Sequence, residues 1–368
     1  MTTDLTGPPP PATPPSPAPP RTARRLTFRL SAPPVSGVLR PRMLTVTLAL
    51  AAVAFLAFCV ETATGDTSLP LTDVLRALVG AADPGTELIV HELRLPRALA
   101  GLLVGIAFGI AGALLQTMTL NPLASPDMMG LTQGAGTAVV AGIVLGWDSG
   151  PSTQTLGLLG ALTAALVVYL LAWKRGATGY RIVLVGVGVA WICTSATDFL
   201  IAHGRQFQAQ AALGWLVGNL NGRTWDQIRP LVWALAVLVP VAVVLGRQLR
   251  TLQLGDDVAR GLGTRVQLVR VSVLLVAVGL VAFGTAAAGP VAFVALAAPQ
   301  VAQRLAGTAV PPPLASGLTG AALVLTADLI ARRLVPDTEL PVGIVTGVLG
   351  APVLLWLLVR ANRAGSGG

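Results

Sequence analysis

The stretch His91–Asp127, HELRLPRALAGLLVGIAFGIAGALLQTMTLNPLASPD, decides the fold class of this chain. It opens with Arg94 and Arg97 on either side of Pro96, continues as an apolar run, and ends in a polar turn that contains two prolines. A helix that crosses a bilayer needs about 20 apolar residues, and proline is well tolerated in the first turn of a helix. The glycines of GLLVGIAFGIAGALL allow neighbouring membrane helices to approach closely. We therefore expect a packed transmembrane helix that begins at these arginines.

Apolar runs of similar length recur along the whole chain. Of its 368 residues, 54% are hydrophobic and only 11% are charged, against about a quarter charged in a typical soluble domain. Ten apolar segments can be drawn, at residues 43–61, 95–117, 130–146, 155–173, 181–202, 229–246, 267–286, 290–306, 313–333 and 342–360. The sequence therefore predicts an all-α polytopic membrane protein with about ten transmembrane helices.

The basic residues lie between the apolar segments, as topology signals do. With the N-terminus inside, 17 of the 25 Lys and Arg residues fall on the inner side and eight on the outer side, which predicts that both termini are cytoplasmic. The net charge of +9 does not indicate a nucleic-acid partner, because the basic residues are not interleaved with aromatic residues on a soluble face. Five spans in each half would make the halves inverted repeats, an arrangement common in transporters.

Residues 1–42 differ in composition from the rest of the chain. Nine prolines lie within the first twenty residues and six arginines follow, a composition that cannot form a packed core. We expect a disordered cytoplasmic tail at 1–42, a transmembrane domain at 43–362, and a short cytoplasmic tail at 363–368.

The sequence lacks the groups that ATP hydrolysis needs. A P-loop requires Gly-Lys followed by Ser or Thr, and the single lysine, Lys174, follows Trp173. The cysteines and histidines have no metal-site spacing, and no nucleophile–base pair can be assembled, so a permease is favoured over a membrane enzyme. Asp328 and Arg332, four residues apart, are expected to pair on one helix face. Contact with a substrate is the alternative for Asp328, and Asp198 has the same two interpretations.

The stretch at 248–266 is too polar to enter the membrane. Within it, DDVARGLG is typical of a short helix with Asp256 and Asp257 at its N-terminal end. Gly261 and Gly263 bracket a break after that helix. Such a helix between two spans is a docking point for another protein, and a solvated loop is the alternative.

Four stretches closely resemble the FecCD family of permeases: RLPRALAGLLVGIAFGIAGALLQTMTLNPLASPDMMGL, LGDDVARGLGTRVQ, AGPVAFVALAAP and ADLIARRLVPDTELPVGIVTGVLGAPVLLWLL. These permeases belong to type II ABC importers for iron–siderophores, haem and cobalamin (vitamin B12), and the resemblance covers about residues 43–362. It implies a ten-helix bundle in a bacterial plasma membrane that works as a homodimer or a paralogous heterodimer. It also implies two cytoplasmic ATPase subunits that bind ATP and magnesium, and an extracytoplasmic siderophore-binding protein. No cofactor or metal is implied in this chain, because the iron stays within its chelate.

The resemblance also implies roles for particular residues. The segment that couples to the ATPase is Leu254, Gly255, Asp256, Asp257, Val258, Ala259, Arg260, Gly261, Leu262 and Gly263. A basic outer rim that meets acidic residues of the binding protein is Arg94, Arg97, Arg332 and Arg333, with lipid-headgroup anchoring as the alternative. The translocation pathway is implied to run near Gly130, Gly134, Gly186, Gly188, Leu200, Val342, Gly343 and Thr346.

The chain departs from the family at the eighth apolar segment. It has Pro299-Gln300 where the family often has Pro-His, and Ala292 and Ala295 where glycines are frequent. These changes leave open whether it pairs with itself or with a paralogue. We expect a permease subunit that moves an iron–siderophore complex into the cytoplasm by alternating access, with haem and cobalamin as alternative cargoes. An ion-coupled secondary transporter and an energy-coupling scaffold without transport are the competing interpretations.

Overall fold

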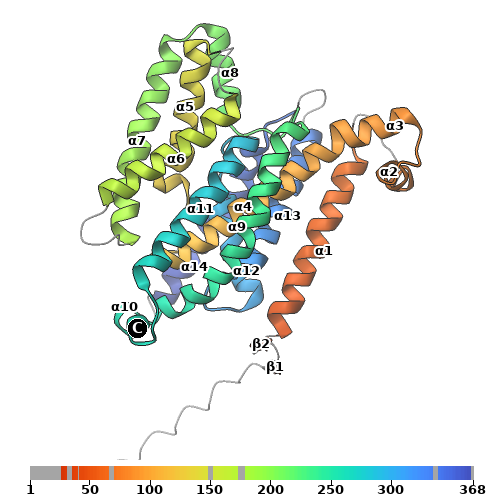
Figure 1. The fold of residues 1–368 in the computed structure, drawn as a ribbon. Coiled ribbons are helices and arrows are strands. Elements are labelled where there is room, and N and C mark those ends of the chain that lie inside the picture. Colours follow the sequence, from red (N-terminus) through yellow and green to blue (C-terminus); the bar gives the residue numbers. More distant parts are fainter. Residues whose placement is uncertain are drawn as a thin grey trace, which may run out of the picture.

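The computed structural model describes residues 26–30, 35–39, 41–65, 70–147, 152–172, 179–334 and 339–365. Residues 1–25 of the expected N-terminal tail, residues 366–368 of the C-terminal tail, and Lys174 lie outside the described residues. Helices make up most of the described chain (Figure 1).

Ten helices occupy the ten apolar segments. They are α1 (Pro41–Ala63), α4 (Leu95–Thr119), α5 (Leu131–Leu145), α6 (Thr153–Ala172), α7 (Gly179–His203), α9 (Trp225–Leu252), α11 (Val266–Ala288), α12 (Val294–Ala306), α13 (Pro313–Arg333) and α14 (Val342–Gly365). Among the described residues, seven helical segments are long and apolar enough to cross a membrane. Helices α5 and α12 and the apolar part of α14 are shorter. The prediction of an all-α multi-pass bundle is confirmed, and the inverted relation between its halves stays a prediction.

Helix α4 lies in the middle of the bundle and packs against α11, α12 and α13 (Figure 1). Its glycines permit this approach. A Cβ on Gly105 would lie 2.5 Å from the Cα of Ala321 on α13, and a Cβ on Gly112 would meet the backbone oxygen of Ala295 on α12. Small residues at such positions let membrane helices pack backbone to backbone, so these glycines hold α4 against its neighbours.

Short elements cover the two ends of the bundle. They are α2 (Leu71–Leu78), α3 (Pro84–Leu88) and α8 (Gln206–Leu216) at one end, and α10 (Asp256–Gly261) at the other. We call the end with α10 the proximal end and the opposite end the distal end. Helix α1 begins and α14 ends at the proximal end (Figure 1). A single 3-10 turn, η2 (Asp127–Met129), lies in the link between α4 and α5.

Helix α4 continues directly from the helical residues before it, which differs from the expected start at residue 95. Helix α3, the π-helical segment η1 (Ile89–Arg94) and α4 follow one another over Pro84–Thr119. Pro96 lies in the first turn of α4, as predicted. Because the ring of a proline clashes with the carbonyl four residues before it, the wider turn of a π segment gives Pro96 the room that an unbroken α-helix lacks.

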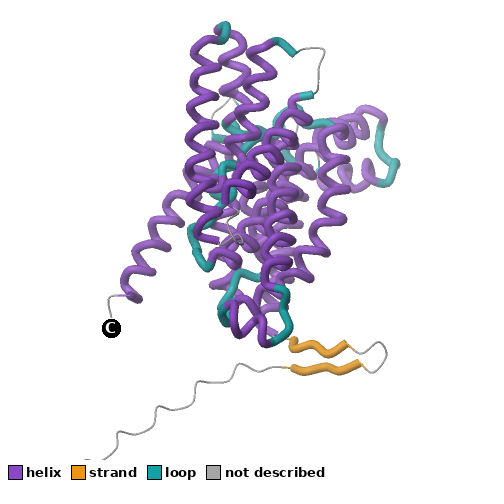
Figure 2. Tube along the Cα trace, turned by 60° about the vertical axis from the view of Figure 1, so that its left-hand side comes forward, coloured by secondary structure: helices purple, strands orange, loops and turns teal. Residues whose placement is uncertain are grey.

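Two strands, β1 (Leu26–Leu30) and β2 (Val35–Leu39), pair antiparallel ahead of α1, with Leu26 opposite Leu39 (Figure 2). These ten residues differ from the disordered tail that the sequence predicts. Their leucine, valine, phenylalanine and threonine residues favour strands, whereas the proline-rich residues before them do not.

Candidate functional site

Helix α10 at the proximal end is the short helix that the sequence predicts between the spans at α9 and α11. Gly255 precedes it with a φ of 95°, and Asp256 and Asp257 lie in its first turn. Gly263 follows it with a φ of 82°. Positive φ values favour glycine because other residues meet steric hindrance there, so the two glycines fix where the chain turns into and out of α10.

One side of α10 is fixed to the bundle. The guanidinium of Arg270 on α11 donates to both carboxylate oxygens of Asp256, over 2.9 and 3.1 Å. Ala259 is fully buried, and the hydroxyls of Thr251 and Thr264 lie 3.1 Å apart across the two ends of the loop. A bidentate arginine–carboxylate pair holds both partners in a defined orientation, so Arg270 fixes α10 to α11.

The other side of α10 is apolar and exposed. Val258 on α10 is 51% exposed, and the residues that flank the helix, Leu254 before Gly255 and Leu262 at the C-terminal cap, are 59% and 62% exposed. Beside these residues, Arg260 donates to Asp257 over 2.7 Å. We call Leu254, Val258 and Leu262 the α10 ridge. An exposed apolar ridge bordered by charges is typical of a surface that binds a protein partner.

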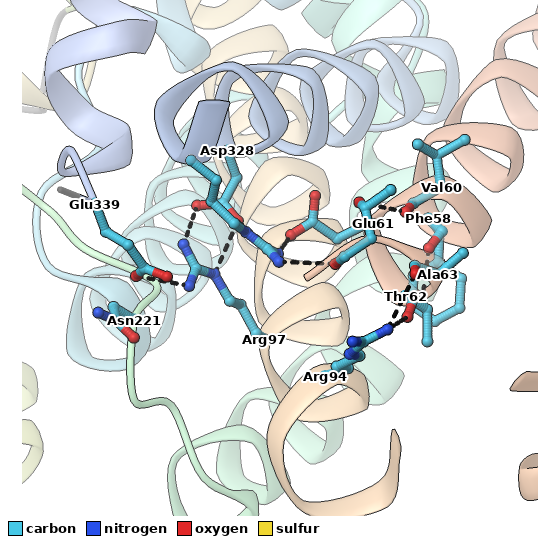
Figure 3. Close-up of polar contacts among 12 residues, drawn as sticks. Phe58, Val60, Glu61, Thr62, Ala63, Arg94, Arg97, Asn221, Asp328 and Glu339 are labelled. Carbon is cyan, nitrogen blue, oxygen red and sulfur yellow. Dashed lines mark hydrogen bonds and ion pairs between the residues drawn. The ribbon is translucent and has the colours of Figure 1, made fainter. Parts of the chain in front are cut away.

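A second polar site lies at the distal end, where α1, α4 and α13 meet (Figure 3). Arg97 on α4 donates through Nε to Asp328 Oδ2 over 2.9 Å and through Nη2 to Asp328 Oδ1 over 3.1 Å. Its Nη1 donates to Glu339, which precedes α14, over 2.9 Å. A buried charge must be paired and hydrogen-bonded, and Arg97 meets that condition with two carboxylates.

Asp328 also binds the arginine one turn further along its own helix. Arg332 donates to Asp328 Oδ2 from Nε and Nη2, each over 3.1 Å, which confirms the predicted pair. The same guanidinium forms an ion pair with Glu61 of α1 and donates to the Thr64 carbonyl over 3.2 Å. We call Glu61, Arg97, Asp328, Arg332 and Glu339 the distal charge network.

The four arginines of the expected outer rim lie in different surroundings. Arg94 and Arg97 are each only 7% exposed, and Arg94 donates to the carbonyls of Thr62 and Ala63 at the end of α1. Arg332 is partly buried in the distal charge network, and Arg333 is exposed. Within this chain, the first three arginines therefore bind its own acceptors instead of forming an exposed rim. Their role toward a binding protein stays a prediction.

Sequence analysis missed Glu61 and Glu339 as members of this network. Glu61 lies at the end of the first apolar segment and is 1% exposed. An ionisable residue inside an apolar membrane segment almost always has a partner. The position of Glu61 in such a segment could therefore have indicated that it pairs with a basic residue. Glu339 lies in a polar link, where an acidic residue is common, so nothing in the sequence around it indicates a buried partner.

The glycines expected near the translocation pathway have unlike surroundings. A Cβ on Gly130 would lie 3.0 Å from the backbone nitrogen of Ala190, and one on Gly186 would lie 2.7 Å from the Cα of Met129. These glycines let η2 approach α7. Gly134 is buried against α6, whereas no atom lies within 4 Å of a Cβ on Gly188.

The other expected pathway residues belong to α7 and α14. Leu200 is partly buried, and Val342, Gly343 and Thr346 are buried at the start of α14. A Cβ on Gly343 would meet the Val217 carbonyl oxygen, so this glycine serves a close backbone contact. Whether any of these residues lines a pathway stays a prediction.

A buried pair of amides joins α4 to α12 at the place where the chain departs from the family. Gln116 Nε2 donates to the carbonyls of Ala295 and Leu296, over 3.4 and 3.1 Å, and Gln300 Nε2 donates to Gln116 Oε1 over 2.7 Å. The carbonyls belong to the first turn of α12. Gln300 therefore supplies a hydrogen-bond donor to the buried side-chain oxygen of Gln116.

Asp127 lies in the link between α4 and α5, outside the spans. Thr132 Oγ1 donates to its Oδ1 over 2.6 Å. Burial raises the pKa of the Asp127 carboxyl above its ordinary value of 3.8, and the hydrogen bond from Thr132 opposes that rise.

Within the described residues, no group of three or more His, Cys, Asp or Glu side chains is arranged to hold a metal ion. A small apolar cavity of about 30 Å³ lies between α12, α13 and α14, lined by residues that include Phe293, Leu323 and Thr346. A larger one of about 320 Å³ lies at the proximal end.

Comparison with known proteins agrees with this architecture. The FecCD transport family matches residues 52–360. The achromobactin transport system permease protein CbrC of Dickeya dadantii (strain 3937) is 41% identical over 294 residues, which cover 79% of this chain and 84% of CbrC. The ferric enterobactin transport system permease protein FepG of Escherichia coli (strain K12) is 37% identical over 299 residues, covering 81% of this chain and 91% of FepG.

Two further proteins are similar at lower identity. The vitamin B12 import system permease protein BtuC of Salmonella arizonae is 35% identical over 284 residues, which cover 75% of this chain and 84% of BtuC. A solved structure described as an inward-facing conformation of a metal-chelate type ABC transporter has a TM-score of 0.74 at 23% identity. It covers 86% of this chain and 99% of that chain, and it shows the same fold. The family match spans all ten membrane helices, apart from the first turns of α1 and the last residues of α14, and the chain therefore belongs to the FecCD transport family.

Proposed function

We propose that this chain is the membrane-spanning subunit of an ATP-binding-cassette importer that moves a ferric siderophore from a binding protein into the cytoplasm. The observation that carries the proposal is the α10 ridge, three exposed apolar side chains on and beside a short helix that Arg270 fixes to α11. In this proposal a cytoplasmic ATPase subunit binds the ridge and supplies both ATP and magnesium. Movement of α10 then reaches the bundle through α11.

The orientation of the chain in the membrane follows from the position of the α10 ridge. If the ATPase binds the proximal end, that end is cytoplasmic, and α1 begins and α14 ends there (Figure 1). The excess of Lys and Arg in the loops and tails on that side supports this orientation. The protein is then a multi-pass protein of a bacterial plasma membrane with both termini in the cytoplasm.

Siderophore is the favoured cargo because the relatives with 41% and 37% identity are named for achromobactin and ferric enterobactin. Cobalamin is the second candidate, since BtuC is 35% identical over a similar share of the chain, and haem is the third. A chelate of this size needs a wide pathway lined by small and apolar side chains, not a tight charged site. We place that pathway near Gly188, Leu200 and the start of α14, between this chain and a second permease copy.

The distal charge network fixes two arginines at the end of the bundle where the binding protein would dock. Asp328 holds Arg97 and Arg332 beside each other, and Arg333 adds an exposed charge at the end of α13. Acidic residues on the binding protein would meet these guanidinium groups at the distal end. Because both arginines already have carboxylate partners in this chain, docking would redistribute existing ion pairs.

The competing proposal of ion-coupled transport needs a carboxylate that binds a proton or sodium inside the membrane. Asp328 is a poor candidate, since its two oxygens accept hydrogen bonds from two arginines. Asp198 lies exposed near the end of α7.

Uptake in a strain that lacks this chain tests the cargo and the energy source together. Labelled ferric siderophore, haem and cobalamin are supplied separately, with the chain restored or absent, and with the partner ATPase intact or unable to hydrolyse ATP. We expect siderophore uptake to need both the chain and ATP hydrolysis. Uptake that persists without ATP hydrolysis would overturn the proposal in favour of ion-coupled transport.

A single substitution on the α10 ridge tests the coupling surface. Val258→Glu places a charge in the middle of the ridge, and we expect it to abolish co-purification of the ATPase. Val79→Glu is the matched control, because Val79 is also exposed, at 77%, but lies at the distal end after α2. Equal ATPase binding by the two variants would contradict a role for the ridge.

A further inference from the structure

A proline interrupts the backbone hydrogen bonding of α12. Pro299 lies inside this helix, and proline has no backbone N–H. In an unbroken α-helix the N–H of residue 299 would donate to the carbonyl of Ala295, four residues before it. The ring of Pro299 also pushes against that carbonyl. The Ala295 oxygen therefore loses its α-helical donor.

Helix α4 supplies a donor to this carbonyl from the side. The amide of Gln116 donates through Nε2 to the Ala295 carbonyl over 3.4 Å and to the Leu296 carbonyl over 3.1 Å. One turn earlier on α4, Gly112 has no side chain, and a Cβ there would meet the Ala295 oxygen. Gly112 thus gives the carbonyl room against α4, and Gln116 gives it a hydrogen bond. Side chains of neighbouring helices satisfy the backbone groups that proline frees in membrane helices.

Gln300, the residue after the proline, fixes the direction in which the Gln116 amide faces. Its Nε2 donates to Gln116 Oε1 over 2.7 Å. A glutamine amide has an acceptor oxygen and a donor nitrogen, so a donor at the oxygen turns the nitrogen of Gln116 toward the two carbonyls. Gln116 is 3% exposed and Gln300 is 8% exposed. Because both amides are buried, bulk water does not replace a hydrogen bond that is lost here.

Another face of α12 borders the small cavity next to α14. Val294, Ala297 and Val301 are three and four residues apart, so they share one face of the helix, and they line the cavity of about 30 Å³. Thr346 and Leu349 line it from α14. Helix α12 is therefore held by hydrogen bonds on the side of α4 and borders open space on the side of α14.

We propose that Gln116 and Gln300 form an amide clamp that takes the place of the hydrogen bond removed by Pro299 and fixes the bend of α12. Gln116 binds carbonyls before the proline and Gln300 follows it, so the clamp joins both sides of the break to one point on α4. Without the clamp, a helix that lacks a hydrogen bond bends more easily at the proline, and the cavity gives α12 space to do so.

Gln116 is therefore a positioning residue for the contact between α12 and α14. The pathway that we place near the start of α14 lies beside this contact, and that link to transport rests on the proposed function. The clamp itself depends only on the fold, so its test needs neither cargo nor ATPase.

A double-mutant cycle on the purified full chain in detergent tests the clamp. Gln116→Met keeps most of the side-chain length and removes the amide, and we expect it to lower the unfolding temperature by about 2–4 °C. Pro299→Ala restores the N–H that binds the Ala295 carbonyl. In that background Gln116→Met should lower the unfolding temperature by only about half as much.

Pro240→Ala is the matched control background, because Pro240 also lies inside a membrane helix, α9, and is exposed. The loss caused by Gln116→Met should be the same in that background as in the unchanged chain. An equal loss in the Pro299→Ala background would overturn the proposal, since the amide would then not replace the missing N–H.

Pulsed EPR measures the bend of α12 directly. Spin labels are placed at Leu305 on α12 and Val348 on α14, which are 47% and 67% exposed. Cys59 and Cys193 are first replaced by alanine, because both are free thiols. Labelled chains are diluted with unlabelled chains, so that only distances within one chain are recorded.

Leu305 lies about 9 Å along α12 from Pro299, so a change of about 20° in the bend moves it by about 3 Å. Gln116→Met should broaden or shift the distance distribution by about that amount, and a distribution like that of the unchanged chain would overturn the proposal. Pro299→Ala keeps both glutamines and should shift the mean distance, because it removes the cause of the bend. This second variant keeps the test decisive even where Gln116→Met does not fold, and an unshifted distance would equally overturn the proposal.

Discussion

Asp328 on α13 binds Arg97 on α4 through two hydrogen bonds, of 2.9 and 3.1 Å, although the two residues are 231 positions apart in the chain. The same carboxylate binds Arg332 on its own helix. One acidic residue therefore holds two arginines from different helices at the distal end of the bundle. This arrangement sets both the stability of that end and the orientation of the charges that a partner would meet.

Loss of either partner in this pair is expected to destabilise the bundle strongly. Arg97→Gln leaves the buried Asp328 with less compensating charge, and breaking a buried pair costs about 3–5 kcal/mol. Thermal unfolding of the purified protein in detergent measures the change. Arg333→Gln is the control, since Arg333 is exposed, and it should change stability by less than about 0.5 kcal/mol. A double-mutant cycle with Asp328→Asn should show non-additive effects, and simple additivity would contradict the pair.

The contact between α4 and α12 should not tolerate even one methyl group. In Gly112→Ala the new Cβ meets the backbone oxygen of Ala295, and overpacking of this kind costs about 1–3 kcal/mol. Gly188→Ala should be neutral or slightly stabilising, because no atom lies within 4 Å of its Cβ. The unfolding temperatures of the two variants provide the comparison, and similar losses in both would refute the close contact.

Gln300 should be replaceable by histidine but not by leucine. A histidine N–H can donate to Gln116 Oε1 as the amide of Gln300 does. Leucine leaves that buried oxygen without its donor, which costs about 1–3 kcal/mol. Unfolding of Gln300→His and Gln300→Leu under identical conditions gives the answer. Equal stability of the leucine variant and the unchanged protein would show that the hydrogen bond contributes nothing.

Asp127 is expected to make stability depend on pH. Burial raises the pKa of its carboxyl above 3.8, so the folded chain keeps this proton to a higher pH than the unfolded chain. Between the two pKa values the folded state binds more protons, and stability from this group falls as pH rises through that window. Above the folded pKa the whole penalty is present.

The variant Asp127→Asn removes this titration and keeps an oxygen that accepts from Thr132. The difference in unfolding temperature between the variant and the unchanged protein should grow in the variant's favour as pH rises above 3.8. Asp257→Asn serves as the control, because the Asp257 side chain is 98% exposed. A difference that stays constant with pH would mean that the Asp127 carboxyl titrates normally.

The helices and part of the sites were predictable because their signals are local. Apolar runs place the ten helices, seven of them in described segments long enough to cross a membrane, and the four-residue spacing of Asp328 and Arg332 predicts their pair. The bond from Arg97 to Asp328 was not predictable, since it depends on how α4 packs against α13. The hydrogen bond from Gln300 to Gln116 was not predictable either. The sequence shows that Gln300 departs from the family pattern, but its partner lies 184 residues away in the chain. Burial of Arg94 and Arg97 likewise depends on tertiary contacts, so an exposed rim was the natural expectation from sequence alone.

Helix α1 is held by polar contacts at both ends and packs along one side against α13. Arg42 binds the carbonyl of Leu305 at one end, and Glu61 pairs with Arg332 at the other, while residues such as Phe55 between them are exposed. The 23 residues of α1 therefore act as a spacer of fixed length between two polar attachments. Insertion of one residue would turn Glu61 by about 100° around the helix axis and raise it by about 1.5 Å, away from Arg332. Natural variation in this helix should accordingly change its exposed residues freely and its length hardly at all.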